Sequence, residues 1–161
     1  MLDFIAAEIA DLNLAEYMQE ALREAELAGL AGEYPIGAVI VIGGEIIARG
    51  RASHNAMKSQ LRHAELNAML DGGLRLWHDY RQAILFTTVE PCPLCLGAAV
   101  MADIPHIIFG LHDKVVQSDQ IVGTNPYVRR HIKSYHGGVL EQDSATIIAR
   151  YNPGAINCIQ K

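Results

Sequence analysis

Two short segments, Arg62-His63-Ala64-Glu65 and Glu90-Pro91-Cys92-Pro93-Leu94-Cys95, determine how the rest of the chain must fold. Cys92 and Cys95 are three residues apart, so on a helix their side chains lie on one face. His63 stands well before them in the chain, and a fold must therefore bring it to the cysteines. One imidazole and two thiolates provide three ligands for Zn²⁺ and leave a fourth position for water. That arrangement is typical of a catalytic zinc site, whereas a structural site is closed.

Glu65 follows the predicted ligand His63 by two residues, and its carboxylate is expected to lie beside the water on the metal without binding the metal. Zinc lowers the pKa of its water from roughly 16 to about 7. A carboxylate next to that water can take its proton and transfer it to a leaving nitrogen. Attack on an amino-bearing ring carbon then expels ammonia, so the pattern predicts a hydrolytic deaminase with Glu65 as the catalytic residue.

The two segments together, and Thr87-Thr88-Val89-Glu90-Pro91-Cys92 in particular, resemble the cytidine and deoxycytidylate deaminase superfamily. The chain is most similar to the branch that contains cytosine deaminase, guanine deaminase and the tRNA adenosine deaminases. The resemblance runs from about residue 34 to residue 110. It implies a cytidine deaminase-like α/β fold, a three-layer α/β/α sandwich with a mixed central sheet, and a homodimer. It also implies one Zn²⁺ per chain.

The resemblance implies two substrate contacts as well. Asn55 matches a family asparagine that hydrogen-bonds the substrate ring, and an amide can donate and accept at once. The interval from Asn55 to His63 is shorter than the family leads us to expect. Ala64 carries over through its backbone N–H, which in the family meets the substrate.

Composition and charge limit the class of protein. With 161 residues, of which 50% are apolar and 19% charged, we expect one globular domain over residues 1–161. The net charge of −5 is unfavourable for gripping a polyphosphate backbone. With two of the three cysteines in Cys-x-x-Cys, Cys158 is left as a free thiol, which favours a reducing compartment. There is no basic leader and no apolar run of membrane-spanning length, so we expect a cytoplasmic protein.

The hydrophobic periodicity predicts alternating helices and strands. Gly43-Gly44 is expected to form a hairpin turn, and Leu66, Met69 and Leu70 are expected to face inward. Helices are predicted over residues 3–10, 14–28, 62–70, 92–102, 128–133 and 141–151, and strands over residues 36–42, 45–49, 84–89, 106–110 and 138–140. The order of the strands in the sheet stays open.

Several other polar, aromatic and charged residues are interpreted mainly as structural. Glu90 is expected to cap the following helix or, equally, to contact substrate. Trp77, in an expected loop, is interpreted as a packing or interface residue, and Cys158 has no assigned role. The basic segment 129–133 is interpreted as a solvated helix face. The remaining histidines are expected to be structural or surface residues, namely His54, His106, His112, His131 and His136.

The sequence leaves three functions open. A free nucleobase or nucleoside of the cytosine or guanine type is the favoured substrate, because the balance of charge is acidic and the tail 152–161 has one basic residue. The alternative is a tRNA adenosine deaminase, which shares the same core motifs. A second alternative is a non-catalytic binding module stabilised by zinc on the same fold.

Overall fold

Continuous apolar runs form the central strands of the sheet. In the computed structural model, which describes residues 2–161, β1 (Gly37–Ile42), β3 (Ile84–Val89) and β4 (His106–Leu111) are buried along their whole length. Successive side chains of a strand point to opposite faces. Ala38 and Ile40 accordingly enter one core cluster, while Val39 and Val41 enter the other. Both faces of the sheet are therefore covered, as the unbroken apolar pattern indicates.

The sheet has the strand order β2-β1-β3-β4-β5 and mixed directions. Strand β1 is antiparallel to both β2 (Glu45–Arg51) and β3, whereas β3, β4 and β5 (Ser134–His136) run parallel. Gly43 and Gly44 turn the chain between β1 and β2 with φ values of 60° and 79°, which glycine adopts most readily. The predicted hairpin and mixed sheet are confirmed.

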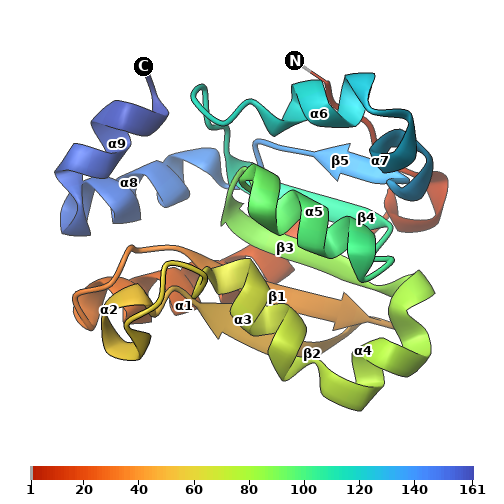
Figure 1. Cartoon of the computed structure of the whole chain (residues 1–161), viewed down its shortest axis with the longest axis horizontal. Coiled ribbons are helices and arrows are strands. Elements are labelled where there is room, and N and C mark those ends of the chain that lie inside the picture. The colour runs from red at the N-terminus through yellow and green to blue at the C-terminus, as the bar shows by residue number, and fades with distance from the viewer. Residues whose placement is uncertain (1) are drawn as a thin grey trace.

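Helices cover the two faces of the sheet, giving the expected three layers (Figure 1). One face carries α1 (Leu14–Leu30) and α8 (Glu141–Tyr151), which contact each other. The opposite face, toward the viewer in Figure 1, carries α3 (Ala64–Asp71) and α5 (Pro93–Met101). The short helices are α2 (His54–Met57), α4 (Gly73–Asp79), α6 (Ser118–Thr124), α7 (Pro126–His131) and α9 (Pro153–Ile159), with 3₁₀ turns at Ala7–Ile9 and Tyr80–Gln82. Within residues 2–161, every helix is too short or too polar to cross a membrane.

Two strand glycines let helices lie directly on the sheet. A Cβ at Gly50 of β2 would lie 2.1 Å from the carbonyl oxygen of Ala64 and 2.4 Å from the nitrogen of Ala68. A Cβ at Gly37 of β1 would meet the backbone of α1 just as closely, at 2.1 Å from the Ala21 oxygen. The backbone of α3 is thus packed against β2 with no side chain between them, and this contact fixes the start of α3.

That close approach corrects the predicted inner face of α3. Its buried residues are Ala64, Glu65 and Ala68. The two alanines lie at the contact with β2, where only a small side chain fits, and the Glu65 side chain reaches Thr87 of β3. Leu70 was predicted to face inward but is 72% exposed. Trp77 lies on α4 and not in a loop, and it is 74% exposed.

The last strand and the N-terminal segment also differ from expectation. The strand predicted over residues 138–140 is wrong, because Ser134–His136 pairs with β4 and buries Tyr135 beside Phe109. The helix predicted over residues 3–10 is reduced to the 3₁₀ turn, since Phe4 forms a bridge with Tyr135. The predicted helix 14–28 is present, although Asn13 makes no side-chain capping bond.

Candidate active site

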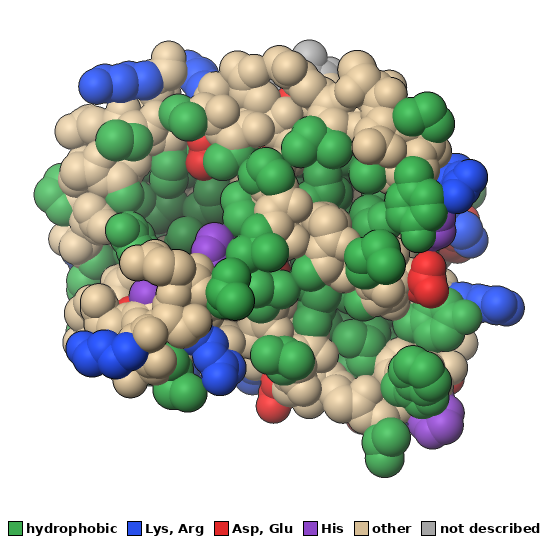
Figure 2. All heavy atoms as spheres, in the orientation of Figure 1, with side chains coloured by type: hydrophobic (Ala, Val, Ile, Leu, Met, Phe, Trp, Pro, Cys, Tyr) green, Lys and Arg blue, Asp and Glu red, His purple; other side chains and the backbone are tan. Residues whose placement is uncertain are grey.

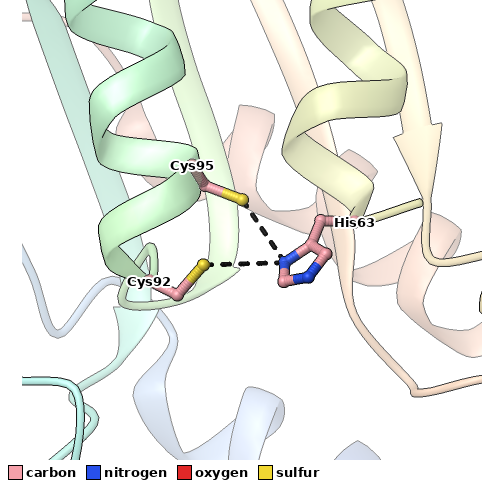
Figure 3. A group of neighbouring side chains, drawn as sticks. All are labelled: His63, Cys92 and Cys95. Carbon is pink, nitrogen blue, oxygen red and sulfur yellow. Dashed lines mark hydrogen bonds between the residues drawn. The ribbon is translucent and has the colours of Figure 1, made fainter. Parts of the chain in front are cut away.

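The predicted zinc ligands lie at the starts of two helices on the same face of the sheet (Figure 3). His63 is the N-cap residue of α3, and Cys92 is the N-cap residue of α5, immediately beyond the end of β3. Pro93 occupies the first turn of α5, where its missing N–H costs no hydrogen bond. Cys95 is one turn further along and fully buried. Helix N-termini carry partial positive charge and therefore stabilise thiolates.

The distances among the three side chains fit a tetrahedral zinc ion. Nδ1 of His63 lies 3.6 Å from Sγ of Cys92 and 3.5 Å from Sγ of Cys95, and the three ligand atoms are all within 4.8 Å of one another. Bonds of about 2.0 Å to nitrogen and 2.3 Å to sulfur at tetrahedral angles separate the two atoms by about 3.6 Å. His63, Cys92 and Cys95 are therefore positioned to bind zinc through Nδ1 and two sulfurs.

The electrostatics of the cluster favour a thiolate. Hydrogen bonds from Cys95 and from His63 lower the pKa of the Cys92 thiol to about 4. The same bond to Cys92, together with burial, raises the pKa of Cys95, which keeps its proton while no metal is present. The pKa of His63 is raised chiefly by its bond to Cys92. A divalent cation would replace these protons, because a coordinating thiol is deprotonated outright.

Glu65 lies beside the ligand cluster, in the first turn of α3. Its carboxylate is 4% exposed and accepts a hydrogen bond from Thr87 Oγ1 at 3.2 Å and one from the Cys95 thiol at 3.4 Å. Burial is the main cause of the raised pKa of this carboxyl group. Thr87 belongs to β3, so the sheet itself holds the carboxylate against the metal ligands. This is the arrangement that proton transfer at a metal-activated water requires.

A pocket of about 300 Å³ opens over the cluster, as Figure 2 shows on the left of the view, where a histidine side chain lies inside the hollow. Ligand pockets of this volume are at the small end of the usual range. It is lined by Tyr34, Ile36, Ala52, His54, Gln60, His63, Ala64, Glu65, Val89, Glu90, Cys92, Asp113 and Ile159. Strand ends, the loop before α3, the segment after β4 and α9 all contribute to its wall.

The structure brings Ala64 but not the side chain of Asn55 to this pocket. Ala64 is the first residue of α3, so its N–H has no carbonyl partner within the helix. The exposed amide of Asn55 donates instead to the carbonyl oxygen of Gly32 at 3.1 Å, and Asn55 is not among the residues of the wall. Its predicted contact with substrate stays a prediction.

His54 was interpreted from sequence as structural or surface, yet it forms part of the pocket wall. Its ring lies 5.0 Å from the His63 ring and 5.3 Å from the ring of Tyr34. Its Nδ1 is buried without a hydrogen-bond partner in the described chain. No local signal distinguishes His54 from the other histidines, because its position depends on how the segment between β2 and α3 folds.

Glu90 anchors the segment that follows β4. Its carboxylate accepts hydrogen bonds from the N–H groups of Asp113 and Asp119, at 3.0 and 3.2 Å, and from Tyr135 Oη at 2.8 Å. None of these bonds goes to α5, so the predicted capping of that helix is wrong. The buried carboxylate instead ties one wall of the pocket to β5.

Residues 12–111 match the sequence model of the cytidine and deoxycytidylate deaminase zinc-binding region. The chain belongs to this family. Its members are zinc-binding deaminases, which agrees with the positions of His63, Cys92 and Cys95.

Relatives whose names refer to tRNA are among the matches to this chain. The tRNA-specific adenosine deaminase of Bacillus subtilis is 41% identical over 99 residues, which are 60% of this chain and 61% of that protein. The tRNA(Ile)-lysidine synthase of Deinococcus deserti is 36% identical over 149 residues, 89% of this chain and 27% of that protein. The chain thus matches less than two thirds of the length of either relative.

Solved structures of two kinds share the fold. One comes from a study of A-to-I editing by tRNA:A34 deaminases at the wobble position of transfer RNA, with a TM-score of 0.67 and 29% identity. It covers 82% of this chain and 98% of the other. Guanine deaminase from Bacillus subtilis has a TM-score of 0.57 and 29% identity, covering 70% and 71% of the two chains.

Metal analysis of the purified protein is expected to find about one zinc per chain. His63→Ala and Cys92→Ala should each reduce the content well below that value, because two protein ligands hold zinc poorly. Cys158→Ala is the matched control, since that thiol is exposed and outside the cluster. A wild-type protein without metal, or an equal loss in the Cys158 variant, would contradict the site.

Proposed function

We propose that this deaminase converts adenosine to inosine in tRNA. The observation that carries the proposal is the 41% identity over 99 residues with a tRNA-specific adenosine deaminase, in a chain whose residues 12–111 match the zinc-binding family. The solved structure from the study of tRNA:A34 deaminases supports the same substrate, because the match covers 98% of that chain. This support favours the alternative named from sequence over the free nucleobase that the sequence placed first.

Glu65 is the residue that moves protons in the proposed reaction. Zinc, when bound, supplies an activated water and stabilises developing negative charge. Glu65 takes a proton from that water and delivers it to the amino group that leaves as ammonia. The bond from Thr87 Oγ1 keeps one carboxylate oxygen fixed, and the other lies 3.4 Å from Cys95 Sγ, facing the ligand cluster.

Three polar groups of the chain are available to the base. The free N–H of Ala64 can donate to a ring nitrogen or exocyclic oxygen at the floor of the pocket. Asn55 can join only if its amide exchanges the bond to Gly32 for one to substrate. The unpartnered Nδ1 of His54 is a third group, and a bound base or an ordered water would satisfy it.

Glu65→Gln should reduce turnover by at least about 10²-fold while zinc content and thermal stability stay close to wild type. Glutamine keeps the shape of the side chain and cannot accept and return a proton. Glu16→Gln on the exposed side of α1 is the control and should retain activity. Loss of zinc in the Glu65 variant would instead make this carboxylate a ligand.

A free nucleobase is the second candidate substrate, and two observations favour it. The pocket of about 300 Å³ is large enough for a single heterocycle. The net charge of −5 does not favour a polyanion. The fold shared with a guanine deaminase is compatible with this candidate.

Ammonia release distinguishes the candidates. We expect deamination of an anticodon stem-loop RNA with adenosine at the wobble position, and activity that falls as salt rises. Guanine, cytosine and adenosine are measured beside it at low and high salt. Reaction of a free base alone, insensitive to salt, would identify a nucleobase deaminase. No ammonia from any substrate, with zinc bound, would leave the non-catalytic binding module.

We also propose that a second copy covers the face formed by α3, α4 and α5, as the family resemblance implies. Two grooves on this face share Leu76 and Ala102 and are mostly apolar. Exposed apolar patches of this kind mark protein interfaces, and Figure 2 shows apolar side chains gathered across the face. Its large exposed apolar side chains are Leu61, Leu70, Leu74, Trp77, Leu94 and Met101. The cytoplasmic location stays a prediction.

Light scattering should give twice the mass of one chain. Trp77→Asp should yield a folded monomer, because a charge cannot be buried unpaired in an apolar interface. Leu30→Asp, on α1 across the sheet, is the control and should stay dimeric. A monomeric wild-type protein would refute the dimer.

A further inference from the structure

Three of the four lysines of the chain are close neighbours of pocket residues. The fourth, Lys133, pairs with Glu8 at 3.2 Å. Lys58, Lys114 and Lys161 are exposed, and in the described chain none of them is within ion-pair distance of a carboxylate side chain. We call these three residues the rim lysines. Because these three ammonium groups form no ion pair within the described chain, they are available to an anionic ligand.

Lys58 belongs to the loop that forms one side of the pocket. It lies between the wall residues His54 and Gln60. Backbone bonds close this loop, from Ser59 N to His54 O at 3.2 Å and from Ser53 N to Arg62 O at 3.0 Å. Lys58 itself has φ of 51°, so it occupies a tight turn at the tip. The backbone of Lys58 is therefore held within the loop that lines the pocket.

Lys114 and Lys161 belong to a different part of the wall. Lys114 follows the wall residue Asp113, and its N–H donates to the carbonyl oxygen of Ile159 at 3.0 Å. Ile159 also lines the pocket, and Lys161 comes two residues later. The segment after β4 and the end of α9 thus bring two lysines together. Figure 2 shows Lys or Arg side chains both above and below the hollow.

The other cations of residues 2–161 are engaged within the chain. In the basic segment 129–133, Arg129 stacks on Phe4 at 4.4 Å and Arg130 on Tyr127 at 4.7 Å. Arg81 stacks on Tyr80, and Arg62 donates to Asn67. The remaining arginines pair with carboxylates, namely Arg23, Arg49, Arg51, Arg75 and Arg150.

The carboxylates around the pocket accept hydrogen bonds and, in the described part of the chain, form no ion pairs with the rim lysines, although Glu33 is close enough to Lys58 to feel its charge. Both oxygens of Glu90 accept hydrogen bonds, and one oxygen of Asp113 accepts from the N–H groups of Val115 and Val116. Glu33 accepts from the N–H groups of Asn55 and Ala56. Backbone N–H groups thus position these carboxylates, and in the described residues none of them forms an ion pair with a rim lysine.

We propose that the rim lysines bind the phosphates on either side of the nucleotide whose base enters the pocket. This inference rests on the proposed action on tRNA and names the surface that holds the RNA strand. Lysines at two sides of a pocket suit a single strand that passes over it, because each ammonium can neutralise one phosphate without reading sequence. A free base has no phosphate and would make no use of them.

The test compares kcat/KM for three substrates, an anticodon stem-loop RNA, adenosine 5′-monophosphate and adenosine, as a function of KCl. The triple variant Lys58→Asn, Lys114→Gln, Lys161→Gln removes the rim charge, and asparagine tolerates the positive φ at position 58. Lys133→Gln, which removes the one paired lysine, is the matched control. Zinc content and thermal unfolding verify that each variant is folded.

We expect the triple variant to lose about 10-fold or more in kcat/KM for the RNA, mostly through KM, with Lys133→Gln unchanged. The slope of log kcat/KM against log salt should become shallower by about 2, since each contact to a single strand contributes about 0.7. A triple variant that deaminates the RNA like wild type, or an equal loss in Lys133→Gln, overturns the rim lysines and leaves the tRNA function standing. If adenosine 5′-monophosphate shows an equal loss in kcat/KM, the lysines bind the phosphate of a small nucleotide. That result would refute the proposal that they bind an RNA strand. Wild-type activity on adenosine without any on RNA refutes the proposed function itself.

Discussion

The close contact between the backbone of α3 and strand β2 is the constraint on which the site depends. It exists because Gly50 has no Cβ, which would otherwise lie 2.1 Å from the carbonyl oxygen of Ala64. His63 and Glu65 flank that alanine, so the same contact that packs the core also sets the height of a zinc ligand and of the proposed catalytic carboxylate. Ala64 and Ala68, at the contact with Gly50, are small for the same reason. The start of α3 therefore contributes both to the packing of the core and to the proposed catalytic site.

The second half of the site depends on the parallel part of the sheet. Strand β3 ends at Val89, and the chain turns through Glu90 into α5, whose first residues carry both cysteines. Outside the carboxyl ends of parallel strands is the usual place for a ligand in a sheet covered on both faces. Glu90 connects this turn to Asp113, Asp119 and Tyr135. This buried carboxylate thereby joins the turn before α5 to the segment after β4 and to β5 through hydrogen bonds.

Net charge is a poor guide to the substrate of this protein. The value of −5 sums cations that are mostly paired or stacked within the chain, so it says little about the mouth of the pocket. The three rim lysines are a small fraction of the basic residues, but they are exposed and, among the described residues, form no ion pair with a carboxylate side chain. Local arrangement decides what a polyanion meets, since screening limits surface charges to a range of about 8 Å at physiological salt.

The sequence by itself determined the chemistry of the centre and the main elements around it. The residue types His63, Cys92 and Cys95 predict zinc because softness and ligand number are properties of side chains, not of the fold. The apolar strands β1, β3 and β4 and helix α8 were predictable because their periodicity is local. The tertiary structure alone decided the strand order, the strand at Ser134–His136 and the outward position of Leu70. It also decided that His54 enters the pocket, that the amide of Asn55 turns to Gly32, and that the segments carrying Lys58, Lys114 and Lys161 all contribute residues to one pocket. These features depend on contacts between segments distant in the chain, where packing and hydrogen bonds override the local preference of each segment.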